Sequence, residues 1–407
     1  MPPSPRAWTR LLFALTLLFA VLNSVNALNK GGDAAVFFEG GRRLLEGKNL
    51  YAGSSAAAGF IGPPFQALFF APFAAIAAVN ATAAKLAWHL AGIVCLVAGV
   101  WLTATTWDGA RSALGVAPRP WLPALFFPLL AVLLPLQTNF EHQNLNPLLL
   151  ALIAGAMLQL TRGSLASGGV LVGIATALKA FPALLIGYLL LRHWRAAIIA
   201  AVTALALTAV PAVMYGHDEY GRVLADFWRL ANSGWPVRGN NQSLIAAIDR
   251  YVNGFSGAGV SEQHGAVLIV YGALASALLA SALWTTVRSS LPAAATLVMQ
   301  ISAIVVLATL LSPIAWDHYW LLLFPAFLVL SDSFDPRLLG GAGRYAFWTA
   351  AILMTGLSPL TLGKAGFNLA RDLSTYTIAG VIVYVSVVTM CWKAPNAAAA
   401  ISAGGRP

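Results

Sequence analysis

A charged stretch at residues 29–51 is the part of the sequence best suited to chemistry. It holds seven ionisable residues in twenty-three positions, directly after an apolar run, in a chain that is 9% charged. Gly31 and Gly32 allow the backbone to turn sharply out of that run, and Asp33 follows at once. A carboxylate held where a membrane meets water is placed to take a proton from a substrate hydroxyl. We therefore predict Asp33 as a catalytic base; the alternative is a solvated loop whose charges only keep it out of the bilayer.

Three further polar clusters occur along the chain, at residues 141–144, 238–243 and 316–318. Together they supply carboxylates, imidazoles, amides and an aromatic ring, the groups that a sugar site uses, with basic residues suited to a phosphate. No ligand spacing requires a metal at His142, Asp317 and His318, so we predict neither a metal nor another cofactor. The predicted substrate-binding residues are Arg42, Glu141, His142, Gln143, Asn144, Lys179, Arg238, Asn241, Gln242, Asp317 and His318.

The composition places these clusters in a membrane protein. The chain is 59% hydrophobic, its mean hydropathy is +0.77, and Leu/Ala-rich apolar runs recur along it, which excludes a soluble globular protein. The runs lack the period-two alternation of a β-barrel, so the predicted fold class is all-α and polytopic. The net charge of +10 comes from basic residues scattered singly between runs, which does not indicate a nucleic-acid partner. Cys95 and Cys391 both lie inside apolar runs, so no disulfide framework is predicted.

Charge distribution predicts the topology. Arg6 and Arg10 precede a first span ending near Leu28, which puts the N-terminus in the cytoplasm and Asp33 on the outer face. Counting residues 63–79 as a span would move Arg111 outside, so we predict an external interfacial helix there. About ten to twelve transmembrane helices result, and eleven of the fourteen acidic residues then lie outside. Further predicted spans cover residues 84–106, 121–138, 145–160, 196–214, 266–286, 292–311, 319–330, 345–357 and 375–392.

The domain prediction follows from the same pattern. Residues 1–392 form a single transmembrane domain, and residues 393–407 form a cytoplasmic tail. The predicted periplasmic segments are a first loop with interfacial helices at 29–83, a long loop at 215–264 and a motif loop at 312–320.

Lys179 lies at the tip of a predicted short hairpin. The apolar runs 168–178 and 183–191 flank it, and each rises only about 15 Å, half the thickness of the hydrocarbon core. An ammonium group at that depth needs a partner. The partner is either a carboxylate or carbonyl of the protein or the phosphate of a lipid-linked substrate.

Several of these segments, taken in order, resemble glycosyltransferase family 87. The resemblance implies a GT-C fold, an extracytoplasmic active site and a polyprenyl-phosphate sugar donor, with mannose expected. Family members often carry a Gly and a second His where His142 and Tyr319 stand here. The segments that carry the resemblance are Gly32-Asp33 with Phe37, Arg42 to Gly47, Leu50-Tyr51, Pro63-Pro64-Phe65, His142 to Asn146, Gly173 to Pro182, Asn241 to Leu244, and Leu311-Ser312-Pro313 with Trp316-Asp317-His318.

The expected function is an inverting glycosyltransferase of the plasma (inner) membrane, acting on its outer face. It would move a hexose from a polyprenyl-phosphate donor to a lipid-linked or envelope glycan acceptor, with Asp33 as the base. The expected partners are this donor, a glycolipid or glycan acceptor and the bilayer, without nucleic acid. A lipid-linked saccharide transporter or flippase is the alternative from another class, and an O-antigen ligase or polymerase is a third. A transporter should place charges along a path across the membrane, whereas here they gather on one face.

Overall fold

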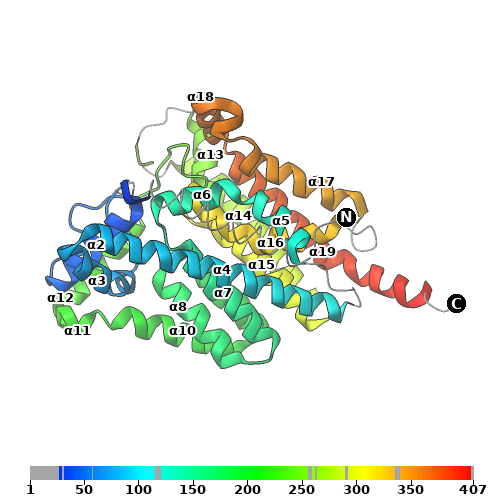
Figure 1. The fold of residues 1–407 in the computed structure, drawn as a ribbon, viewed down its shortest axis with the longest axis horizontal. Coiled ribbons are helices and arrows are strands. Elements are labelled where there is room, and N and C mark those ends of the chain that lie inside the picture. Colours follow the sequence, from blue (N-terminus) through cyan, green and yellow to red (C-terminus); the bar gives the residue numbers. More distant parts are fainter. Residues whose placement is uncertain are drawn as a thin grey trace, which may run out of the picture.

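The computed structural model describes residues 27–29, 32–56, 58–114, 121–254, 259–261, 264–288, 292–334 and 340–404. Over these residues the regular structure is helical, with extended pairing limited to three isolated bridges, so the predicted all-α class is confirmed. The elements are α2 (Gly32–Leu45), α3 (Pro64–Val79), α4 (Ala81–Ala113), α5 (Trp121–Ala131), α6 (Leu133–His142), α7 (Asn146–Thr161), α8 (Leu165–Leu178), α9 (Ala183–Arg192), α10 (Trp194–Ala209), α11 (Ala212–Tyr215), α12 (His217–Ala231), α13 (Leu244–Asn253), α14 (Gly265–Arg288), α15 (Ala293–Leu311), the 3-10 helix η1 (Asp317–Leu323), α16 (Phe324–Leu330), the 3-10 helix η2 (Ser331–Phe334), α17 (Gly340–Ala351), the π-helix η3 (Ile352–Gly356), α18 (Pro359–Asp372) and α19 (Thr375–Gly404) (Figure 1).

The helices identify a multi-pass membrane protein, but fewer of them span completely than the ten to twelve predicted. In the described residues five helices are long and apolar enough to cross a membrane: α4, α10 with α11, α14, α15 and α19. Two bent pairs, α5 with α6 and α17 with α18, raise the number to seven. Much of the difference comes from two predicted spans, 145–160 and 319–330, which correspond to the short helix α7 and to η1 with α16, and the first predicted span lies largely outside the described residues. At about 1.5 Å per residue in an α-helix, neither of the two short segments reaches the roughly 30 Å of a hydrocarbon core.

Other predicted segments match only in part: 84–106 lies inside the longer α4, and 121–138 is divided between α5 and α6. Residues 64–79 form α3, which only Asn80 separates from α4, and the Asn80 side chain accepts a hydrogen bond from Ala83 N at the start of α4. Its position at the membrane surface stays a prediction. The segment 393–407, predicted as a tail, begins as a continuation of α19 through Gly404. The first predicted span lies outside the described residues except for its last turn at 27–29.

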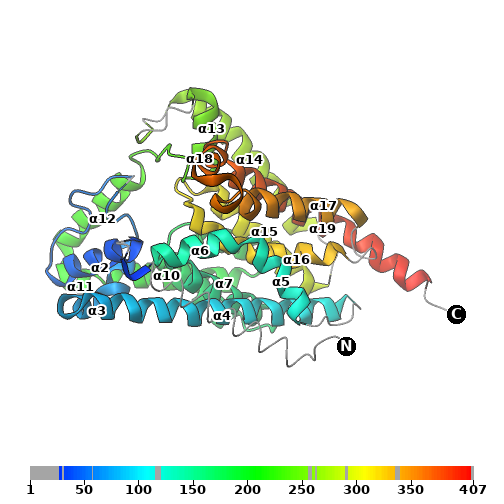
Figure 2. The ribbon, with the colours of Figure 1, turned by 45° about the horizontal axis from the view of Figure 1, so that its top comes forward.

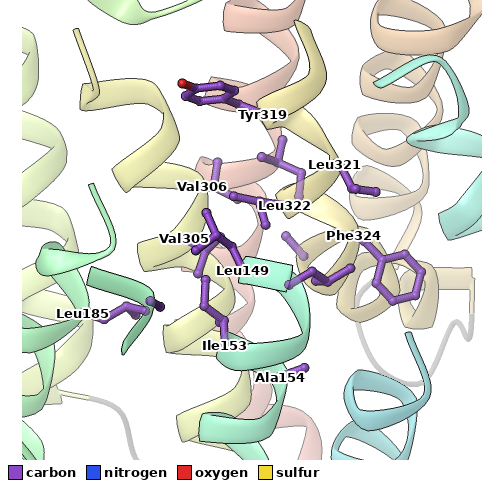
Figure 3. Close-up of a cluster of buried hydrophobic side chains, with 14 of the residues drawn as sticks. Leu149, Ile153, Ala154, Leu185, Val305, Val306, Tyr319, Leu321, Leu322 and Phe324 are labelled. Atoms are coloured by element: carbon purple, nitrogen blue, oxygen red, sulfur yellow. The ribbon is translucent and has the colours of Figure 1, made fainter. Parts of the chain in front are cut away.

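The bundle is packed around α15. In an 18-residue window of this helix, 89% of the window is buried inside the protein. Val305 and Val306 lie against Leu149 of α7, Leu185 of α9 and Leu322 of η1 (Figure 3). Close van der Waals packing of this kind holds membrane helices together where burial from water contributes little. The middle of the bundle is therefore a solid aliphatic core that gives the neighbouring site a fixed support.

Two glycines bring α8 against α10. A Cβ atom at Gly169 would lie 2.6 Å from Ala196 O, and one at Gly173 would lie 2.6 Å from Ala200 O. Small residues spaced by four allow helix backbones to approach this closely in membranes. The close crossing fixes α8, and with it the position of Lys179 immediately after its last residue.

The two ends of the bundle differ. Helices α2, α3, α11 and α12 gather at one end, and α13 adjoins α18 beside them (Figure 2). At the far end of α4, Arg111 forms a buried ion pair with Asp332 of η2, and Trp107 Nε1 donates to the same carboxylate at 2.6 Å. That ion pair anchors the far end of α4 to η2.

Candidate active site

A cavity of about 690 Å³ opens at the end of the molecule that carries α2. Its lining comes from segments far apart in the sequence: the start of α2, the turn after α6, the tip between α8 and α9, the loop before η1 and the end of α18. Seven of the twelve predicted site residues line it, namely Asp33, His142, Asn144, Lys179, Arg238, Asp317 and His318.

Asp33 is placed by the glycine before it. Gly32 has φ +53°, a conformation that favours glycine, and a Cβ atom there would lie 2.7 Å from His142 O. Only a glycine therefore lets the start of α2 approach the turn after α6 so closely. Asp33 stands in the first turn of α2, where the helix dipole favours an anion, and it faces the cavity beside Asn144.

Asp33 is held as an anion by two partners. Asn144 Nδ2 donates a hydrogen bond to its Oδ2 at 2.6 Å, and His318 Nε2 lies 3.2 Å from the same oxygen. Burial alone would raise the pKa of Asp33, but the contacts with His318, His142 and Asn144 outweigh it and lower the pKa to about 2. The side chain is still 27% exposed. Asp33 is thus ionised at neutral pH and accessible from the cavity.

A hydrogen bond to its backbone carbonyl holds His318 in place. It lies in η1, and Asn146 Nδ2 donates to its carbonyl oxygen at 3.0 Å while also donating to Asn139 Oδ1 at 3.1 Å. Burial lowers the pKa of His318 to about 4 against the opposing effect of Asp33, so the ring is neutral at neutral pH. The neutral ring lies close to Asp33 without adding a competing positive charge, and its Nε2 does not reach hydrogen-bond geometry with any described acceptor.

Lys179 has amide and aromatic partners in place of a carboxylate. Its ammonium donates to Asn146 Oδ1 at 3.0 Å and to Asn144 Oδ1 at 3.3 Å, and it lies 3.3 Å from the centroid of the Tyr319 ring. Among the described carboxylates none is within ion-pair distance of it. Asn144 therefore bridges Lys179 and Asp33, and Lys179 has no direct ion pair with a described carboxylate. Burial lowers the pKa of Lys179 well below its usual value, against the opposing effect of Asp33, so an anionic ligand in the cavity would favour its charged form.

Asp317 and Arg371 form a second charged pair in the cavity. Arg371 Nη2 donates to Asp317 Oδ2, and the Arg371 guanidinium also lies 5.0 Å from the Phe367 ring. Burial raises the pKa of Asp317 to about 6, although Arg371 opposes the change. The pair is therefore complete only above a mildly acidic pH.

One arm of the cavity is apolar and reaches the outer surface. Phe181 and Leu184 line it from the start of α9, Ala308 and Leu311 from α15, and Leu279 from α14. Leu279 is also 40% exposed on the outside of the bundle. Leu279 thus places this part of the lining, the apolar arm, at the outside of α14, a helix in which only 17% of an 18-residue apolar window is buried.

Five predicted site residues lie away from the cavity lining. Arg42 is exposed on α2, where it pairs with Glu39 and Glu46, because the i, i+3 and i, i+4 spacings place those carboxylates beside it. Glu141 accepts a hydrogen bond from Gln137 of its own helix at 3.2 Å.

Gln143, Asn241 and Gln242 stabilise the backbone around the site. Gln143 ends α6 with φ +53°, and its carbonyl accepts from Trp88 Nε1 at 2.8 Å. Asn241 forms a bridge to Trp316 and accepts from Ala315 N at 2.8 Å, and Gln242 Nε2 donates to Arg371 O at 2.6 Å. These side chains hold the segments that carry site residues but do not themselves line the cavity.

Among the lining residues that were not predicted as site residues, Tyr319 and Arg371 contact Lys179 and Asp317. Tyr319 follows the 316–318 cluster directly, so its neighbours were the available signal. Arg371 lies in a polar segment between the last two apolar runs, on the side of the chain already predicted to face outward. In the described part of the chain, no group of three or more His, Cys, Asp or Glu side chains is arranged to hold a metal ion.

Known proteins resemble this chain over most of its length. A mannosyltransferase from Mycolicibacterium smegmatis, named as polyprenol-phosphate-mannose-dependent alpha-(1-2)-phosphatidylinositol mannoside mannosyltransferase, is 28% identical over 359 residues, which cover 81% of this chain and 76% of the relative. The enzyme of the same name from Mycobacterium tuberculosis is 27% identical and covers 73% and 69%. The crystal structure of ArnT from Cupriavidus metallidurans bound to undecaprenyl phosphate matches with a TM-score of 0.45 at 14% identity over 98% of this chain and 79% of ArnT, a likeness too loose to carry an argument.

The family assignment rests on the match to a family model. The model of glycosyltransferase family 87 matches residues 60–313, more than half of the 407 residues. That range contains His142, Asn144, Lys179 and Arg238 of the cavity. The chain is a member of glycosyltransferase family 87, and its activity is glycosyl transfer.

Proposed function

We propose that this protein transfers a mannosyl residue from a polyprenyl-phosphate donor to a hydroxyl of a glycolipid or envelope glycan, with inversion at the anomeric carbon. The observation that carries the proposal is one cavity that combines a partly exposed, ionised carboxylate, Asp33, with a lysine that lacks a carboxylate partner among the described residues, Lys179, and an apolar arm. The names of the relatives support mannose and the polyprenyl-phosphate carrier.

The lining of the cavity favours one orientation of the donor, with its polyprenyl chain on the apolar side and its sugar on the polar side. Its polyprenyl chain would lie in the apolar arm beside Leu279 and Leu184, entering from the lipid-facing side of α14. Its phosphate would then meet Lys179, which stands next to Phe181 where the arm joins the polar part. The sugar would occupy the space between Lys179 and Asp33.

The chemistry is a single displacement. The acceptor oxygen forms a bond to the anomeric carbon while the bond from that carbon to the phosphate oxygen breaks, and the acceptor proton passes to Asp33. An Asp33 with a low pKa is sufficient because the acceptor hydroxyl becomes strongly acidic as its oxygen bonds to the oxocarbenium-like carbon. The leaving group is a phosphate that departs as an anion, so it needs cations nearby and no general acid.

The charges of the cavity suit this reaction. Among its described lining residues, histidines apart, Lys179, Arg238 and Arg371 outnumber Asp33 and Asp317 by one positive charge. A donor phosphodiester would neutralise that surplus. The reaction makes the phosphate a dianion and Asp33 neutral, so the balance is preserved while the negative charge moves toward the cations.

The outer face of the plasma membrane is the proposed location of the site. The positive-inside distribution of Arg residues supports this orientation, because Arg111 and Arg162 lie at the ends of α4 and α7 away from the cavity. A flippase is less well supported, since its charges should continue across the bilayer, whereas aliphatic side chains such as Val305 and Leu149 fill the middle of this bundle.

Asp33→Asn is expected to lower kcat by roughly 10²- to 10⁴-fold, because the amide keeps the shape but cannot accept the proton. The measurement is transfer from radiolabelled polyprenyl-phosphate mannose to glycolipid acceptors by the purified protein. Asp218→Asn, at a fully exposed carboxylate of α12, is the matched control and should leave kcat unchanged. Near-normal turnover of a folded Asp33→Asn protein would exclude this base.

Lys179→Met is expected to raise the KM for the donor by about tenfold or more, because a charge-assisted hydrogen bond to the phosphate is lost. Its melting temperature should change little, since the partners of Lys179 are amides and rings; breaking a buried ion pair would cost roughly 3–5 kcal/mol. Lys364→Met, at an exposed lysine of α18, is the control. A strong loss of stability with an unchanged donor KM would contradict the phosphate role.

Protonation of Asp317 should lower the transfer rate on the acidic side of the pH profile, its acidic limb. Its raised pKa means that the folded protein binds this proton more tightly than the unfolded chain, so its contribution to stability falls as pH rises from about 4 to 6. Over the same range it becomes ionised and acquires its ion pair with Arg371. We expect activity to fall as pH is lowered through about 6, and Asp317→Asn to remove that limb while lowering activity near neutral pH. An identical limb in the variant would show that another group titrates.

The orientation is tested by cysteine labelling in intact cells, with Cys95 and Cys391 replaced by Ala. Ser233→Cys, at an exposed position after α12, should react with a membrane-impermeant maleimide. Ser112→Cys, at the exposed far end of α4, should react only after the cells are permeabilised. The reverse pattern would place the cavity on the cytoplasmic face.

A further inference from the structure

Arg250 of α13 is a fully buried cation that joins two segments beside the cavity. It is 1% exposed, and its Nη1 donates to three carbonyl oxygens of the 237–241 segment, that of Arg238 at 3.2 Å among them. On its other side, Nε donates to Asp372 O at 3.1 Å and Nη2 to Ser374 Oγ at 2.7 Å. One guanidinium therefore fixes the end of α18 relative to the 237–241 segment.

The two segments are in direct contact at Gly239. A Cβ atom there would lie 3.2 Å from Asp372 N and 3.3 Å from the carbonyl carbon of Arg371. Gln242 adds a second link, because its Nε2 donates to Arg371 O at 2.6 Å and also to Gly239 O. Arg238 and Arg371 thus leave adjoining stretches of backbone, and both line the cavity.

Both arginines have unused hydrogen-bonding capacity. Arg371 forms its ion pair with Asp317 through Nη2, while its Nε is buried without a hydrogen-bond partner in the described structure. Arg238 is exposed, and no described carboxylate pairs with it. A buried, unpaired donor of a charged group is costly unless a ligand supplies the acceptor.

We propose that Arg238 and Arg371 form a second anion subsite, separate from Lys179, which binds a phosphate group carried by the acceptor. This inference rests on the proposed function and names a substrate feature that it leaves open. Two arginines on adjoining stretches of backbone, both lining the cavity, supply the planar, bidentate hydrogen-bond donors that a phosphate accepts. The donor phosphate is assigned to Lys179 because the apolar arm begins there, between Phe181 and Leu184, whereas the two arginines come from the α13 and α18 side (Figure 2).

The test compares two acceptors that differ only in charge. Both carry the same glycoside and alkyl tail, joined by a phosphodiester in one and by a neutral ether in the other. The readout is the ratio of kcat/KM for the anionic acceptor to that for the neutral one, with the donor KM measured in parallel. Wild-type protein should favour the anionic acceptor, and Arg238→Gln should lower the ratio by about tenfold, the scale of a charge-assisted hydrogen bond.

Two further variants sharpen the test. Arg371→Lys keeps the charge that faces Asp317 but loses the planar fork, so it should also lower the ratio. Arg222→Gln removes an exposed arginine of α12 that pairs with Glu219, and it should leave the ratio at the wild-type value.

The remaining outcomes separate the two phosphate sources. A raised donor KM in Arg238→Gln with an unchanged acceptor ratio would assign the arginines to the donor and overturn the proposal, as would no change in either quantity. If wild-type protein transfers to neither acceptor, the proposed function fails, and the subsite is judged by binding alone. Weaker binding of the phosphodiester acceptor to Arg238→Gln would then support it, and equal binding would overturn it.

Discussion

The structure depends on keeping a few charges buried beside an apolar bundle without cancelling them. An ammonium or carboxylate removed from water needs hydrogen bonds to remain charged. Here Asn144 forms a hydrogen bond with each ion: its Oδ1 accepts from Lys179 and its Nδ2 donates to Asp33. Because an amide carries no net charge, the two ions are stabilised without forming a closed pair, and each is left able to meet a substrate group.

The amide residues of this chain divide into two roles that explain how the cavity is built. Asn144 and Asn146 contact the reactive groups or the backbone that carries them. Asn241 and Gln242 instead join the 237–242 segment to the loop before η1 and to the end of α18. The buried Arg250 works with the second group. Rigid positioning from outside the cavity allows its charged side chains to hold their geometry before a substrate arrives.

Two surfaces of different character meet at Lys179. On one side the arm lined by Leu184 and Leu279 opens toward the lipid-facing side of the bundle, and on the other the polar lining leads to Asp33 and Arg371. A substrate with an apolar tail and a charged head can satisfy both surfaces at once. The aliphatic core around α15 lies behind this junction and gives it a rigid wall.

The sequence by itself determined the helical class, the positions of the long apolar helices and seven of the residues that line the cavity. These follow from local properties, because long apolar runs can only be helices in a membrane and polar clusters at their ends must share a face. Only the tertiary structure separated Asn144, which contacts Asp33, from Gln143, which faces away, since one residue of left-handed backbone reverses the side-chain direction. It also showed that Arg42 is paired within its own helix and that Arg371, distant in sequence, reaches Asp317. Such pairings depend on how helices far apart along the chain are packed, and no local pattern encodes that packing.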